Sequence, residues 1–106
     1  MKLTIVVIED DDTSALVRKL LEQGYHSTKL ASTGGFLLQG NTTLLIGVED
    51  DEVDSVLAII RSTCVRRKKL LPHTTSELPT AINLPIEIEA GGAIVFVVDV
   101  HDYYKL

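Results

Sequence analysis

The fold is decided by residues 28–47, which read T-K-L-A-S-T-G-G-F-L-L-Q-G-N-T-T-L-L-I-G. This pattern is typical of a strand, a glycine-rich turn and a second strand. Gly34 and Gly35 allow positive φ and the close approach of a ligand, because they lack a Cβ. Phe36 adds a flat apolar face, and Asn41 adds an amide. These features favour a small site for a nucleotide or another planar phosphorylated ligand, and the alternative is a hairpin whose glycines only make the turn.

The composition bounds the class of protein. The 106 residues predict a single domain spanning 1–106, and the 45% of hydrophobic residues excludes a disordered chain. No apolar run reaches the roughly 18 residues of a membrane helix, so we expect no membrane insertion. Acidic residues follow the apolar start directly, which indicates a first strand and not a signal peptide.

The cysteine content and the net charge indicate which cellular compartment and which kinds of ligand fit this protein. Cys64 is the single cysteine, which excludes an intramolecular disulfide and fits a reducing cytoplasm. The formal net charge of −5 argues against general binding to nucleic acid or anionic membranes, although a small anionic ligand remains compatible with it.

Hydrophobic periodicity predicts an α+β fold. The expected strands are 2–8, 25–31, 43–48, 86–90 and 93–100, and the expected helices are 13–24 and 53–64. With 86–90 and 93–100 joined through a bend at the glycines 91–92, the order is βαββαβ, the ferredoxin-like arrangement. We therefore expect an antiparallel sheet with two helices on one face.

Charged residues mark the expected helix ends. Asp11, Asp12 or Thr13 is expected to cap the first helix, and capping explains these acids better than a metal site does. Cys64 continues the apolar stripe of the second helix, which indicates a core residue and not a nucleophile. The basic run 66–69 is expected to close that helix as a solvated face, and 70–85 to form a loop.

The first, third and last strands are apolar on both faces. Two helices cannot shield both faces of one sheet, so the remaining face needs another cover. A second copy of the same sheet is the simplest cover, and the sequence therefore predicts self-association.

Several motifs resemble one known family. They are T-K-L-A-S-T-G-G-F-L at 28–37, G-N-T-T at 40–43, I-G-V-E-D at 46–50, V-D-S-V-L-A-I-I at 53–60 and G-G-A-I-V-F-V at 91–97. Together they resemble the cyclic di-AMP receptor family of PII-like signal transduction proteins over nearly the whole chain. The pairing of T-G-G-F with G-N-T-T at this separation is the specific part of the resemblance.

The resemblance implies a homotrimer of ferredoxin-like subunits that binds one cyclic di-AMP in each of three clefts between neighbours. It implies no catalytic activity, no cofactor and a downstream protein partner whose identity the sequence does not give. The ligand-binding residues that it implies are His26, Thr28, Gly35, Phe36, Leu37, Asn41, Gly47 and Gly92.

The resemblance also implies a role for each position. Thr28 would hydrogen-bond the ligand, Phe36 would lie against an adenine, and Asn41 would read an adenine edge because its amide both donates and accepts. Gly35 and Leu37 would contact the ligand through backbone and apolar atoms. The two remaining glycines, at 47 and 92, would let the ligand lie close to the third and last strands.

The chain departs from the family pattern at two places. Family members carry arginine where this chain has His26, and a histidine is mostly neutral near pH 7. We therefore expect weaker binding, or binding that tightens as the pH falls toward about 6. The loop 70–85 is also shorter and poorer in glycine than the family's loop, so the partner is the least transferable expectation.

Two other functions stay open. A PII-like sensor of another adenine nucleotide such as ATP would keep the fold, although no cluster of basic residues lies near the glycine turn to favour a triphosphate. An enzyme is less favoured, because His26, His73 and His101 are scattered single residues and neither paired carboxylates nor a metal pattern is present.

Overall fold

The computed structural model describes residues 1–30, 40–71 and 86–106. Its elements are β1 (Lys2–Glu9), α1 (Asp10–Glu22), β2 (Thr28–Leu30), β3 (Asn41–Val48), a 3-10 turn η1 (Asp50–Glu52), α2 (Val53–Thr63), β4 (Arg67–Leu71), β5 (Ile86–Ala90) and β6 (Ala93–Asp99). None of the helices in the described ranges is long and apolar enough to cross a membrane.

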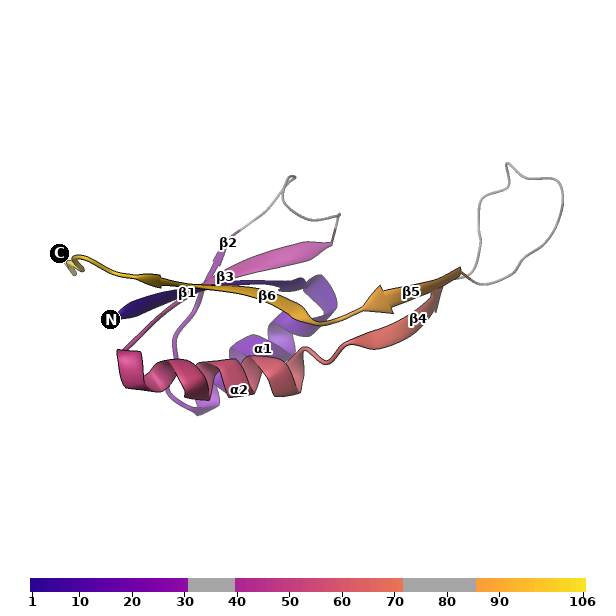
Figure 1. Cartoon of the computed structure of the whole chain (residues 1–106), viewed down its shortest axis with the longest axis horizontal. Coiled ribbons are helices and arrows are strands. Elements are labelled where there is room, and N and C mark those ends of the chain that lie inside the picture. Colours follow the sequence, from indigo (N-terminus) through magenta and orange to yellow (C-terminus); the bar gives the residue numbers. More distant parts are fainter. Residues whose placement is uncertain (31–39, 72–85) are drawn as a thin grey trace, which may run out of the picture.

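Four strands form the main sheet, in the order β2-β3-β1-β6 (Figure 1). Every neighbouring pair is antiparallel, and β1 lies in the middle with Val6 opposite Leu44 of β3 and Val95 of β6. This arrangement confirms the predicted ferredoxin-like sheet. The chain termini lie at one end of the molecule, and β4 and β5 extend from the other end (Figure 1).

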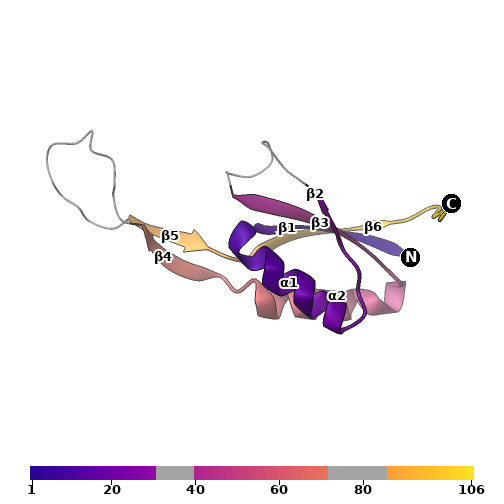
Figure 2. The ribbon, with the colours of Figure 1, turned by 180° about the vertical axis from the view of Figure 1, so that it is seen from behind.

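Both helices cover the same face of this sheet, as predicted (Figures 1 and 2). Alternate residues of β1 and β3 point toward the helices, because successive side chains of a strand point to opposite faces. The buried core that results is Val6, Ile8, Leu16, Leu20, Leu44, Ile46, Val48, Val56, Ile60 and Cys64. The prediction that Cys64 belongs to the core is confirmed, although the residue lies just after the last residue of α2.

The opposite face of the sheet, here called the open face, has no helix over it. It carries Leu3, Ile5, Val7, Asn41, Thr43, Leu45, Gly47, Ile94, Phe96 and Val98 from the three longer strands. Ile94, Phe96 and Val98 are 38%, 44% and 42% exposed, respectively. The sheet is therefore apolar on a face that this chain does not cover with its helices.

The first helix begins earlier than predicted. Its first residue is Asp10, and Glu9, not a residue at 11–13, occupies the N-cap position without a side-chain capping bond. The three aspartates instead fill the first turn, where the positive end of the helix dipole stabilises carboxylates. The C-terminal end matches the prediction, because Gly24 follows the cap with φ of 85°.

The prediction that the basic run closes the second helix was wrong, although the side chains of Arg66, Arg67 and Lys68 are exposed as expected. Helix α2 ends at Thr63, and Arg67 begins strand β4, which pairs with β5 in a separate two-stranded arm (Figure 1). Lys68 lies opposite Glu89 in that pair. A cross-strand pair of opposite charges stabilises an antiparallel ladder, and this pairing explains why the cations belong to a strand. Of the predicted loop, 72–85 lies outside the described residues.

Ion pairs and glycines hold the arm to the body. The Nη2 atom of Arg67 lies 3.3 Å from Oδ1 of Asp12 and 3.9 Å from Oε2 of Glu9. On the other strand, Gly91 and Gly92 have φ of 78° and 74°. A Cβ on Gly91 would lie 2.1 Å from the carbonyl oxygen of Val65, so only glycine fits there.

We predict that Gly91→Ala lowers the free energy of unfolding by about 2 kcal/mol or more, because it adds positive-φ strain and a backbone clash. The matched control is Gly24→Ala, where φ is also positive but nothing lies within 4 Å of the added Cβ. Urea unfolding measures both variants. Equal losses for the two variants would contradict a close contact at Val65.

Candidate functional site

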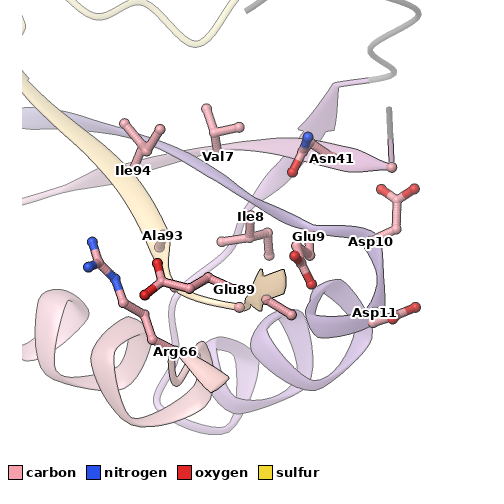
Figure 3. A pocket seen from close by; sticks show the side chains of 14 residues that line it. Val7, Ile8, Glu9, Asp10, Asp11, Asn41, Arg66, Glu89, Ala93 and Ile94 are labelled. Carbon is pink, nitrogen blue, oxygen red and sulfur yellow. The ribbon is translucent and has the colours of Figure 1, made fainter. Parts of the chain in front are cut away.

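A hollow of about 700 Å³ lies where the arm joins the sheet (Figure 3). Its walls come from the end of β1, the start of α1, the start of β3 and the turn between β5 and β6. The lining residues are Val7, Ile8, Glu9, Asp10, Asp11, Gly40, Asn41, Arg66, Glu89, Ala90, Gly91, Gly92, Ala93 and Ile94. Val7, Asn41 and Ile94 belong to the open face, so the hollow lies at one end of that face.

The start of α1 forms a fixed wall of this hollow. The Thr42 hydroxyl donates a 2.5 Å hydrogen bond to Oδ1 of Asp10, and the backbone N–H of Asp10 donates to the carbonyl oxygen of Gly40 at 2.7 Å. These bonds join the helix start to the start of β3. They set the position of Asn41, which lies between Gly40 and Thr42 at the edge of the hollow.

Arg66 and the glycine pair form the wall on the arm side. A Cβ on Gly92 would lie 3.1 Å from Cγ and 3.3 Å from Nε of Arg66, so the arginine side chain packs against bare backbone. The N–H of Gly92 donates to the carbonyl oxygen of Cys64 at 2.8 Å. This bond ties the turn before β6 to the end of α2, and it keeps Arg66 and Gly92 side by side.

The structure divides the predicted ligand residues between two places. Asn41 and Gly92 line the hollow. Thr28 and Gly47 lie on the open face, because Thr28 pairs with Leu45 and Gly47 is two residues further along β3. The other predicted positions either precede β2, as the exposed His26 does, or lie outside the described residues, as Gly35, Phe36 and Leu37 do.

Gly47 leaves the sheet backbone accessible from the open face. Nothing lies within 4 Å of a Cβ built on this residue, and its partner across the ladder is Leu3 of β1. Thr28 is exposed on the adjoining edge strand. A ligand on this part of the open face would thus meet bare backbone with a hydroxyl nearby. The hollow lies at the other end of the same face, where Asn41 precedes Gly47 by six residues on β3.

Arg66 is the basic residue of the lining, and the sequence did not assign it to a site. The basic run was predicted to form the solvated end of a helix. That prediction gave no reason to expect any of its residues beside a cavity. A signal was present, since the cations at 66–69 and the alternating acids at 87 and 89 have the complementary charges of a hairpin. The local sequence does not tell, however, that the root of this hairpin lines the same hollow as Asn41.

Two features of the described residues bear on metal binding and nucleophilic chemistry. They contain no group of three or more His, Cys, Asp or Glu side chains able to hold a metal ion. Burial, together with the nearby Asp12 carboxylate, raises the pKa of the Cys64 thiol to about 11. A thiol with so high a pKa is almost entirely protonated at neutral pH, so Cys64 is poorly suited to act as a nucleophile.

Comparison with known proteins assigns the class. The fold is α+β and ferredoxin-like, with a hollow at the end of an uncovered sheet face. The model of the cyclic-di-AMP receptor family matches residues 1–106, the whole chain, and the protein belongs to that family. A crystal structure of a functionally unknown protein from Pediococcus pentosaceus is similar at 35% identity and a TM-score of 0.75, covering 99% of this chain and 96% of that one.

We predict that Cys64 reacts slowly with Ellman's reagent in the native protein. The raised pKa leaves so little thiolate at pH 8 that the rate should be roughly 200-fold below that of a free thiol, before burial slows it further. The rate should rise steeply as the pH approaches 11. Unfolding the same protein in guanidinium chloride should restore the free-thiol rate, and fast reaction of the folded protein at pH 8 would contradict the burial.

Proposed function

We propose that this protein is a non-enzymatic cytoplasmic receptor that binds cyclic di-AMP at the subunit interfaces of a homotrimer. It relays the state of the ligand site to a partner protein through its loops. The family match over residues 1–106 carries the proposal. The site geometry supports it, because residues that the family resemblance assigns to the ligand are found along the open face and in the hollow at its end.

The open face supports assembly. Ile94, Phe96 and Val98 expose roughly two-fifths of their surface next to the partly buried Leu3 and Ile5. A contiguous apolar surface of this kind marks a protein interface in a water-soluble fold. Contact between open faces would also bring a second subunit to Thr28 and Gly47, and a cleft between subunits would result.

The site chemistry suits a cyclic dinucleotide. Asn41 has an amide that both donates and accepts, which matches an adenine edge. Phe36, Gly35 and Leu37 are proposed to contact the base and its sugar from the glycine turn, and His26 is proposed to approach a phosphate. If His26 has this role, the affinity should rise as the pH falls toward about 6, because the charged form binds anions.

The position of the hollow would allow a bound ligand to contact the arm. Arg66 directly precedes β4, Glu89 and Ala90 are the last two residues of β5, and Gly91 follows it. These four lining residues belong to the root of the arm. A ligand in the hollow would contact this root. The arm and the segment that it carries are therefore proposed to report occupancy to a partner.

We predict that cyclic di-AMP binds the purified protein in calorimetry and raises its melting temperature, whereas ATP and cyclic di-GMP do so less. Ligand that binds only the folded state stabilises it, by about 2.7 kcal/mol at a hundredfold excess over Kd. Gly47→Ala should weaken binding roughly tenfold without loss of stability, since its Cβ meets no neighbour in the chain. A larger shift with ATP would instead favour the alternative, a PII-like sensor of that nucleotide.

We predict that the wild-type protein sediments as a trimer at micromolar concentration and that Phe96→Glu shifts it toward monomer. A charge on the open face would have to be desolvated in the interface. The control is Leu21→Glu, which adds the same charge at a 49% exposed position on α1, away from the sheet. A monomeric wild-type profile, or equal effects of the two variants, would exclude assembly through the open face.

A further inference from the structure

We propose that Arg66 supplies the positive charge that holds a phosphate of the ligand in the hollow. This inference rests on the proposed function and assigns a contact that the family resemblance did not. The fold brings Arg66 to the hollow that Asn41 and Gly92 also line.

Arg66 is the one basic side chain among the described residues that line this hollow. Its neighbour in sequence has a structural role, since Arg67 is paired with Asp12 and Glu9 and donates from Nη1 to the carbonyl oxygen of Val65 at 3.2 Å. Arg66 makes no comparable ion pair or hydrogen bond with the described part of the chain. Its guanidinium group retains its five donors for a ligand.

The backbone beside Arg66 is shaped for close packing of that side chain. Its Cγ and Nε atoms lie at the positions that a Cβ on Gly92 would crowd, at 3.1 and 3.3 Å. The stem of the arginine is thereby held against bare main chain, and the side chain reaches from the root of the arm along the side of the hollow near Ala93 (Figure 3). Such a held stem lowers the entropy lost when the guanidinium binds a phosphate bidentately.

Two carboxylates of the hollow have partners of their own. Glu9 faces Arg67, and Asp10 accepts the bond from Thr42. Glu9 and Asp10 belong to the wall formed by β1 and α1, whereas Arg66 belongs to the arm side. Glu89 also lies on the arm side, so Arg66 is the one lining side chain there that attracts an anion.

The test is calorimetric titration of the full chain with cyclic di-AMP. Arg66→Gln should weaken binding roughly 10- to 100-fold, the usual loss for a hydrogen-bonded charge pair, and Arg66→Lys should recover part of it. The loss should shrink at high salt, because salt screens the phosphate contact. The matched control is Arg61→Gln, which removes the same charge from an exposed position on α2 outside the hollow.

The outcomes separate this inference from the proposed function. If the wild-type protein binds cyclic di-AMP and Arg66→Gln binds as tightly as Arg61→Gln, the role of Arg66 is overturned and the receptor function stands. If the wild-type protein does not bind cyclic di-AMP, both are overturned. If Arg66→Gln fails to fold, the test uses Arg66→Lys and the salt dependence of wild-type binding. An affinity that changes neither with Arg66→Lys nor with salt would overturn the contact.

Discussion

The constraint on which the rest of the structure depends is that two helices can cover only one face of a four-stranded sheet. Helices α1 and α2 bury alternate residues of β1 and β3, with Val6, Leu44 and Ile46 at 0% exposure. The intervening residues are also apolar, so the burial that stabilises one face leaves the other in contact with water. An apolar face without a cover is thus a consequence of the same strands that make the core.

The hollow at the end of the sheet results from the way the chain passes from α2 to β6. The chain leaves α2, builds the arm of β4 and β5, and returns to β6 through Gly91 and Gly92. Positive φ and the lack of a Cβ at Gly91 let this turn pass beside Val65, and Arg67 ties the arm to the acidic start of α1. The hollow is the space that these close contacts leave between the arm root, β1 and β3.

The charge pattern explains how an acidic protein can accommodate an anionic ligand. The net charge is −5, and several carboxylates line the hollow. Burying or crowding like charges is costly unless each is paired, and here arginine, a threonine hydroxyl and the helix dipole offset them. If Arg66 has its proposed role, phosphate recognition depends on the position of this one cation more than on the net charge.

The sequence by itself determined the order of the strands and helices of the main sheet, the two-helix face, the uncovered apolar face and the family motifs. Periodicity is a local property, so it reports which residues of Lys2–Glu9 or Val53–Thr63 are apolar whatever lies beside them. Only the tertiary structure decided that α1 begins at Asp10, that 67–71 pairs with β5, and that Arg66 and Gly92 meet Asn41 at one hollow. These facts depend on contacts between residues tens of positions apart, where cross-strand pairing and long-range packing override local preference.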